Sequence, residues 1–167
     1  MKSVFFGRHG KSSWDLEGIN DEQRPLLPRG EKKTALVAEF LRKKGIKPDL
    51  IIASQAVRAY ETAKIVAGAL DYPANNIKRD RRIYDGPYDR ILDMIYGTDP
   101  AVNSLMIFGH NPLITQLPNL FLSPGIDFMP TSAILCISFR ADSWETISTV
   151  AAHMEFYVDP KMVKQNI

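Results

Sequence analysis

Three short, uninterrupted apolar runs constrain the fold of this chain more than any other feature of its sequence. They lie at residues 4–6, 50–53 and 105–108 and read Val-Phe-Phe, Leu-Ile-Ile-Ala and Leu-Met-Ile-Phe. Apolar runs of this length are typical of strands that are buried on both faces, as in a parallel sheet covered by helices. We therefore predict three parallel strands at the centre of the molecule.

Helical patterns lie between these runs and after them. Apolar residues at helical spacing and capping signals predict helices over residues 31–44, 55–70, 88–96 and 112–122. Ser54 stands where its hydroxyl could cap the start of the second helix. Because strands alternate with helices, we expect an α/β fold.

Two more strands are predicted near the C-terminal end, over residues 133–139 and 146–153, paired through a turn at residues 141–143. No internal repeat or Gly/Ser-rich linker divides the 167 residues. We therefore expect one domain over residues 1–158, followed by a loosely attached tail over residues 159–167. The predicted architecture is a single-domain, three-layer α/β/α fold around a mostly parallel central sheet.

Composition argues against several classes of function. The 21 Lys and Arg residues against 19 Asp and Glu leave a net charge of only +2, which gives no reason to expect nucleic-acid binding. No apolar run approaches the roughly 18 residues of a membrane span, and the N-terminal run is too short for a secretory signal. The single cysteine, Cys136, cannot form an internal disulfide. We expect a cytoplasmic protein with a buried thiol and no membrane or nucleic-acid partner.

Basic and polar residues come directly after each of the three apolar runs. Arg8 and His9 come after the first run, Arg58 lies one turn into the helix after the second, and His110 comes after the third. Because ligands bind beyond the carboxyl ends of strands in an α/β sheet, we expect these side chains to converge. Guanidinium groups and helix N-termini both favour phosphate oxygens. The pattern therefore predicts a site for a phosphoryl group.

The three histidines do not have the spacing of a metal-binding motif. We therefore expect no metal and no other cofactor, so that the reaction is metal-independent. His153 lies in an alternating strand pattern without a partner motif, and we interpret it as structural.

Five motifs occur in order along most of the chain. They are Arg-His-Gly-Lys-Ser-Ser-Trp at 8–14, Asp-x-x-Arg-Pro-Leu-x-x-x-Gly at 21–30, Ser-x-x-x-Arg-Ala-x-x-Thr-Ala at 54–63, Gly-His-Asn-Pro at 109–112 and Pro-Thr-Ser-Ala at 130–133. Together they resemble the motifs of the histidine phosphatase superfamily. The finer resemblance is to its small bacterial branch, the SixA-type phosphohistidine phosphatases.

The resemblance implies a phosphoglycerate mutase-like fold and a phosphatase in which His9 is the nucleophile and becomes a covalent phosphohistidine. The residues that it implies for binding the phosphoryl oxygens are Arg8, Arg58 and His110. Those expected to contribute to substrate binding are Arg24, Asp21, Ser13 and Asn111. For Arg24 and its two successors, a structural turn into the next helix remains the alternative.

Larger members of the superfamily carry a carboxylic acid proton donor on an inserted region between the second and third strands. Here the corresponding stretch, residues 81–88, is short and contains no glutamate, and its only carboxylate is Asp85. We therefore expect no large lid insertion and an open, shallow site. The general acid stays open between His110, Asp21 and solvent.

Protein phosphohistidine is the favoured substrate, because imidazole leaves more readily than an alkoxide and because an open site suits a folded protein. A small-molecule phosphomonoesterase acting on a phosphorylated metabolite is the closest alternative. A non-catalytic phosphoprotein-binding module is a third, although the intact set of arginines and histidines argues against it.

Overall fold

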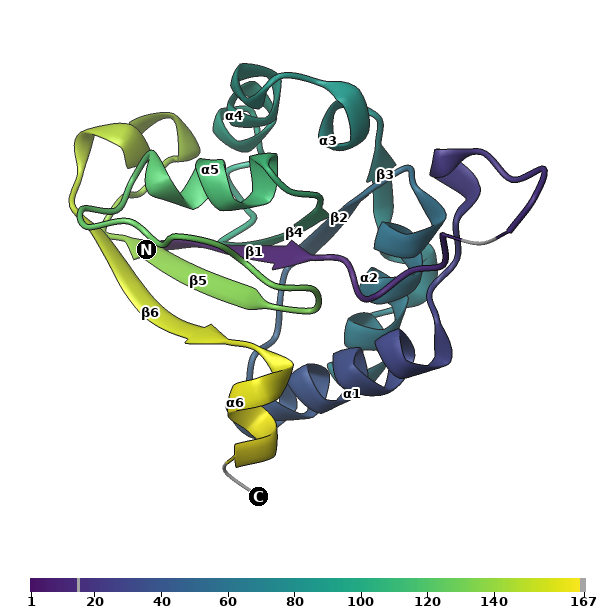
Figure 1. Cartoon of the computed structure of the whole chain (residues 1–167). Helices are drawn as coiled ribbons and strands as arrows, with labels where there is room; N and C mark the ends of the chain where they lie inside the picture. Colours follow the sequence, from purple (N-terminus) through teal and green to yellow (C-terminus); the bar gives the residue numbers. More distant parts are fainter. Residues whose placement is uncertain (15, 166–167) are drawn as a thin grey trace.

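The computed structural model describes residues 1–14 and 16–165, and within them six strands form one sheet with helices on both faces (Figure 1). The strands are β1 (Lys2–Arg8), β2 (Leu50–Ser54), β3 (Lys78–Asp80), β4 (Ser104–Gly109), β5 (Ile134–Phe139) and β6 (Ala152–Val158). The helices are α1 (Pro28–Lys43), α2 (Val57–Ala69), α3 (Arg82–Asp85), α4 (Tyr88–Tyr96), α5 (Leu113–Asn119) and α6 (Pro160–Gln165). Three short 3-10 helices are η1 (Asp21–Gln23), η2 (Ala74–Asn76) and η3 (Trp144–Thr149). The predicted three-layer α/β/α architecture is confirmed.

The strand order is β3-β2-β4-β1-β5-β6. The strands β3, β2, β4 and β1 run parallel, and β5 runs antiparallel to both of its neighbours. The three apolar runs thus form three adjacent strands. In the parallel register Arg8 is level with Gly109, so the carboxyl ends of β1 and β4 meet at one edge of the sheet.

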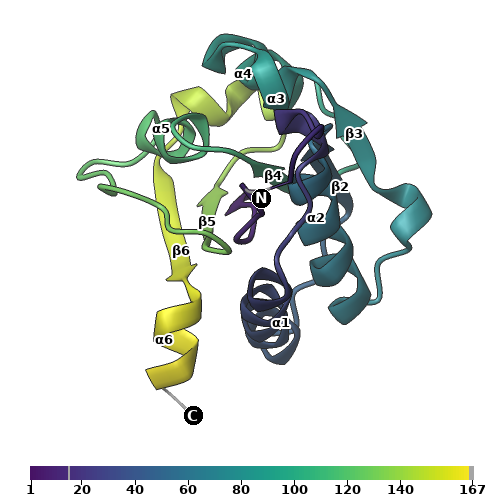
Figure 2. The same cartoon turned by 45° about the vertical axis from the view of Figure 1, so that its right-hand side comes forward.

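Alternate residues of the central strands face two separate apolar layers. Phe5 and Met106 pack in the cluster that includes residues of α1 and α2, whereas Val4 and Leu105 pack in the cluster with residues of α4 and α5. Figures 1 and 2 show α1 and α6 on one side of the sheet and α3, α4 and α5 on the other. Cys136 is buried as expected. No helix in the described ranges is both long and apolar enough to cross a membrane.

The strand predicted over residues 146–153 has the wrong bounds. Its first half belongs to η3, and the strand that pairs with β5 is Ala152–Val158. Trp144 and Ile147 are both buried, and their spacing of three residues matches one turn of a 3-10 helix. The predicted pairing with β5 is nevertheless confirmed.

The loose tail expected after Asp159 is also wrong for residues 160–165, which form α6. Asp159 accepts a hydrogen bond from the Met162 amide, and Pro160 begins the helix, so a capping residue and an N-terminal proline start it. Val163 packs against the apolar cluster of α1 and α2. Residues 166 and 167 lie outside the described residues.

Candidate active site

A pocket of about 250 Å³ lies where β1, β2 and β4 end. The residues that line it are Arg8, His9, Lys11, Ser12, Trp14, Asp21, Arg24, Arg58, His110, Asn111 and Thr131. A larger hollow, of about 600 Å³, lies between α1 and α2 and is lined by ordinary helix-surface residues such as Lys32 and Glu61. We take the smaller pocket as the site because the strand-end arginines and histidines converge only there.

The structure brings Arg8, His9, Arg58 and His110 together. Arg8 ends β1 and His9 is the next residue, whereas His110 comes directly after β4. Arg58 lies in the first turn of α2 and is buried. The predicted convergence of these four side chains at the carboxyl ends of the strands is therefore seen in the structure.

His9 is held in one tautomer. Its Nδ1 lies 2.7 Å from the carbonyl oxygen of Gly10, and since a carbonyl only accepts, Nδ1 must carry the proton. The other ring nitrogen, Nε2, therefore keeps its lone pair. Burial, together with the charges of Arg58 and Arg8, lowers the pKa of His9 to about 4, although the Gly10 bond acts in the opposite direction. His9 is thus neutral at pH 7.

The loop that carries His9 packs tightly against α1 and α2. The Gly10 amide donates to Thr62 Oγ1 at 2.9 Å, and the Leu27 amide donates to the Lys11 carbonyl at 2.8 Å. Any side chain at Gly30 would collide with that Lys11 carbonyl. The glycine of the 21–30 motif is therefore explained by the close approach of this loop to the start of α1.

His110 lies beside His9, with ring centroids 5.1 Å apart. Its Nε2 is 2.7 Å from Ser54 Oγ, and its Nδ1 is buried with no hydrogen-bond partner among the described residues. Burial and the neighbouring His9 and Arg58 lower the pKa of His110 to about 3. The prediction that Ser54 caps α2 is wrong, because the N-cap is Ala56 and has no side-chain cap.

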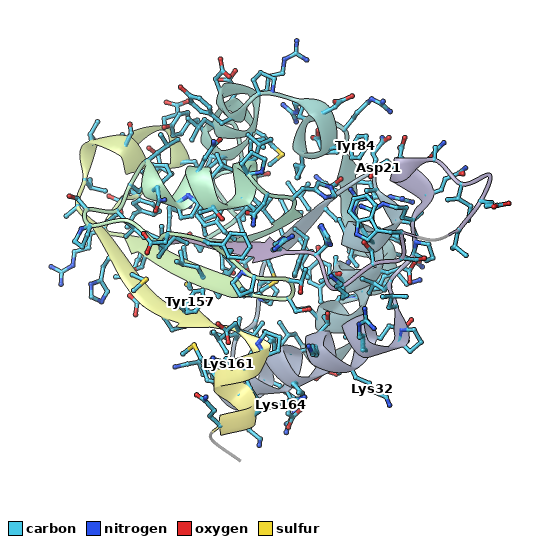
Figure 3. The ribbon with its side chains drawn as sticks, in the orientation of Figure 1. Asp21, Lys32, Tyr84, Tyr157, Lys161 and Lys164 are labelled. Atoms are coloured by element: carbon cyan, nitrogen blue, oxygen red, sulfur yellow. The ribbon has the colours of Figure 1, made fainter. Side chains whose placement is uncertain are left out.

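Asp21 holds two of the pocket arginines. Arg58 donates to the Asp21 carbonyl at 2.7 Å and to its carboxylate at 3.1 Å, and Arg24 Nε donates to the other carboxylate oxygen at 3.1 Å. Tyr84, which lies beside Asp21 in Figure 3, donates its hydroxyl at 2.8 Å. Burial raises the pKa of Asp21, but the Tyr84 and Arg58 hydrogen bonds and the arginine charges outweigh it and lower the pKa to about 2. Asp21 is therefore a counter-ion at neutral pH and not a proton donor.

Arg24 belongs to the pocket rather than only to a turn. Its Nη1 donates to Ser12 Oγ at 3.0 Å and to the Ser13 carbonyl at 3.1 Å, and the Trp14 ring stacks 3.5 Å from its guanidinium carbon. Ser12 lines the pocket, whereas Ser13 is not among the lining residues. Adjacent residues of an extended segment point in opposite directions, and Ser12 forms a bridge with Leu26 there. Ser13 contributes to the site through its carbonyl contact with Arg24.

Asn111 and Arg8 hold the loop on the opposite side of the pocket. Arg8 Nη1 and Asn111 Nδ2 both donate to the Met129 carbonyl, at 3.1 and 2.9 Å. The side-chain oxygen Oδ1 of Asn111 accepts a hydrogen bond from the Thr115 hydroxyl at 2.7 Å. Phe128 places its ring 5.4 Å from the Arg8 guanidinium carbon. Asn111 thus lines the pocket while it fixes this loop, and its expected role in substrate binding stays a prediction.

Sequence reasoning missed several residues of the site. Lys11, Ser12, Trp14 and Thr131 line the pocket and lie within the quoted motifs, so the motifs themselves could have indicated them. Tyr84 had no sequence signal, because its contact with Asp21 depends on how α3 packs.

Asp85, the one carboxylate of residues 81–88, lies away from the pocket. It forms an exposed ion pair with Arg81 at 3.0 Å and is not among the lining residues. Within residues 1–14 and 16–165, no group of three or more His, Cys, Asp or Glu side chains is placed to hold a metal ion. Metal independence stays a prediction.

Comparison of the sequence with known families and proteins gives one consistent result. The profile of the histidine phosphatase superfamily (branch 1) matches residues 4–89. An uncharacterized chloroplastic protein of Arabidopsis thaliana is 32% identical over 147 residues, which cover 83% of this chain and 66% of that protein. An uncharacterized protein of Mycobacterium tuberculosis is 31% identical over 110 residues, 66% of each chain. The matches thus cover slightly less than two thirds of both relatives.

Solved structures share the fold over nearly the whole chain. The protein histidine phosphatase SixA, complexed with tungstate, has a TM-score of 0.83 and 21% identity, and the match covers 96% of this chain and 99% of that one. A mycobacterial glucosyl-3-phosphoglycerate phosphatase complexed with VO3 has a TM-score of 0.66 and 16% identity, over 93% and 98%. The predicted phosphoglycerate mutase-like fold without a large insertion is thereby confirmed.

Proposed function

The chain belongs to the histidine phosphatase superfamily, and from this membership we propose that it removes phosphoryl groups from phosphohistidine side chains of a protein, through a covalent phosphohistidine intermediate on His9. One observation carries the proposal. His9 is neutral, its proton is held on Nδ1 by Gly10, and its free Nε2 shares a pocket with the guanidinium groups of Arg8, Arg24 and Arg58.

The proposed chemistry uses each part of this arrangement. The Nε2 lone pair attacks phosphorus, an N–P bond forms, and the bond from phosphorus to the substrate nitrogen breaks. The released electron pair stays on the substrate imidazole, which leaves in its neutral form if it arrives protonated. Water then hydrolyses the phosphohistidine on His9 and returns the ring to its starting state. The guanidinium groups offset the charge on the transferring phosphoryl oxygens.

None of the described residues that line the pocket is placed there as a protonated acid, and this supports a nitrogen leaving group. Asp21 is the only carboxylate among those lining residues and is ionised, and both pocket histidines are neutral. An alkoxide leaving group needs strong help from a general acid, typically worth about 10²–10⁴-fold. A protonated imidazole needs none, so phosphohistidine suits this pocket better than a phosphomonoester does.

Two exposed aromatic residues beside the pocket arginines support a protein substrate. The exposed fractions of Trp14 and Phe128 are 73% and 61%, and each ring lies over a pocket arginine. Exposed aromatic side chains are enriched at protein–protein interfaces. Rings in these positions would contact the surface that surrounds a phosphorylated histidine.

The test compares kcat/KM for a phosphohistidine protein with kcat/KM for a panel of alkyl phosphomonoesters. We expect the phosphoprotein to be preferred and an alkali-stable, acid-labile phosphate to be trapped on His9. His9→Ala should abolish both turnover and trapping. A preference of tenfold or more for a phosphomonoester would replace this proposal with the small-molecule phosphatase. Binding of the phosphoprotein without phosphate release would indicate a non-catalytic module.

A further inference from the structure

Ser54 is a fully buried hydroxyl at the end of β2, with an exposed fraction of 0%. Its Oγ accepts a hydrogen bond from the Ala56 amide at 3.1 Å and lies 2.7 Å from His110 Nε2. The Ala56 amide stands just before α2, which carries Arg58. A single hydroxyl therefore contacts both His110 and the segment that leads to Arg58.

The proton on Ser54 has one acceptor within reach. A serine hydroxyl has one hydrogen and two lone pairs, and one lone pair of Ser54 already accepts the hydrogen bond from the Ala56 amide. If His110 Nε2 also donated, the hydroxyl hydrogen would be buried without an acceptor among the described residues, which is costly. The favourable arrangement is that Ser54 donates to Nε2. The ring proton of neutral His110 then lies on Nδ1.

The geometry points to Ser54 as a positioning residue that fixes the tautomer of His110, so that His110 presents its Nδ1–H to a phosphoryl oxygen. Nδ1 is the one buried ring nitrogen of the described residues that has no partner, although His110 lines the pocket. A buried donor without a partner is costly, so a phosphoryl oxygen that reaches Nδ1 would gain this hydrogen bond. This inference rests on the proposed function, since it assigns His110 a task in binding the transferred group.

The groups around His110 are compatible with a neutral ring. His9 and Arg58 oppose protonation of His110, as does Arg24 more weakly, whereas Asp21 favours it. Tyr84 packs edge-on against the ring at 5.7 Å between centroids. With a neutral ring, the tautomer decides whether His110 offers the phosphoryl oxygens a donor or a repelling lone pair.

The first test is spectroscopic. In the ¹⁵N-labelled protein at pH 7, the three histidines can be assigned with His153→Asn and His9→Asn, and long-range ¹H–¹⁵N correlations report which ring nitrogen of His110 is protonated. We expect Nδ1–H in the wild type and in Ser54→Thr, and a mixture of tautomers in Ser54→Ala. A wild-type proton on Nε2 would overturn the inference, and this result requires no variant of Ser54 to fold.

The second test uses orthovanadate as the phosphoryl probe. We expect Ser54→Ala to weaken vanadate binding on the order of tenfold, from the loss of one oriented donor, and Ser54→Thr to restore most of it. Ser138→Ala is the matched control, because Ser138 is also buried but pairs with Glu155 near the opposite end of the sheet. Equal vanadate affinity in the wild type and Ser54→Ala would overturn the inference. Neither readout depends on phosphohistidine being the substrate, so failure of the proposed function is detected separately.

Discussion

The ring centroids of His9 and His110 lie 5.1 Å apart, and His9 needs a neutral ring for the attack proposed for it. The fold keeps them neutral mainly by burial, and the nearby arginine charges act in the same direction. Three guanidinium groups in one small pocket therefore do more than attract phosphate. They also help to keep a proton off the nitrogen that must attack.

The lowered histidine pKa values predict a dependence of stability on pH. The pKa of His9 falls from the usual 6.5 to about 4 on folding, so between these values the unfolded chain binds more protons and stability is lost as the pH falls. We expect the free energy of unfolding to decrease from pH 7 to pH 5 by on the order of 4 kcal/mol more in the wild type than in a His9→Asn/His110→Asn variant, about 2 kcal/mol for each histidine. Urea titrations at pH 7 and pH 5 measure the free energy of unfolding. Equal decreases in the two proteins would contradict the view that His9 and His110 are neutral in the folded protein.

Substitutions of Arg58 and Asp85 are expected to have very different effects on turnover. Arg58 is buried in the pocket, so Arg58→Ala should lower turnover on the order of 10²-fold. Asp85 pairs with Arg81 on the surface, so Asp85→Asn should change turnover by less than about twofold. Initial rates of phosphate release decide the matter. A severe loss in Asp85→Asn would mean that the missing general acid is Asp85 after all.

At the scale of elements, two loops lie beside the pocket, and each of them contacts one of the pocket arginines. The loop after β1 places Trp14 on Arg24, and the loop before β5 places Phe128 near Arg8 and gives its Met129 carbonyl to Arg8 and Asn111. The arginines proposed to bind phosphate thereby also hold the segments that flank the pocket.

Removal of the two aromatic rings should weaken the binding of protein substrates more than that of small substrates. We expect Trp14→Ala and Phe128→Ala to raise KM for a phosphohistidine protein by at least about fivefold, because each removes an exposed ring that lies over a pocket arginine. KM for phosphoramidate should change little. Leu120→Ala is the control, because Leu120 is an exposed apolar residue next to α5 that neither lines the pocket nor, unlike Trp14 and Phe128, is aromatic and placed over a pocket arginine. An equal rise in KM for both substrates would mean that the rings act by holding the arginines in place and not by contacting the partner protein.

The helix α6 is a second element whose contribution can be measured. A chain that ends at Asp159 loses the packing of Pro160 and Val163 against the layer that contains α1. We expect its free energy of unfolding to fall by about 1–3 kcal/mol, while activity at 25 °C persists because none of the residues that line the pocket belongs to α6. A chain that ends at Gln165 serves as control. Unchanged stability on removal of α6 would restore the expectation of a loose tail.

At the scale of the whole molecule, the sequence predicts the features that apolar patterning determines and misses those that depend on packing. The runs that became β1, β2 and β4 are long and apolar enough to be recognised, whereas β3 is a three-residue edge strand, Lys78–Asp80, with no apolar residue. Arg8, His9, Arg58 and His110 could be predicted because each comes at or just after the end of a strand that the pattern reveals. The contacts of Ser54 with His110 and of Tyr84 with Asp21 join segments more than 50 residues apart, so no local pattern could predict them.

Asp21 gives the pocket a resident anion, and this bears on how the enzyme recovers between turnovers. In the proposed reaction, inorganic phosphate is the final product and must leave a site lined by Arg8, Lys11, Arg24 and Arg58. The Asp21 carboxylate already holds two of these cations and would repel the departing dianion, so we expect it to weaken product inhibition. Asp21→Asn should therefore lower the inhibition constant for phosphate by about three- to tenfold. An unchanged or higher constant would show that Asp21 only orients the arginines. If the proposed function holds, a carboxylate that competes with the substrate for the same cations keeps free phosphate from occupying the pocket between one phosphoprotein and the next.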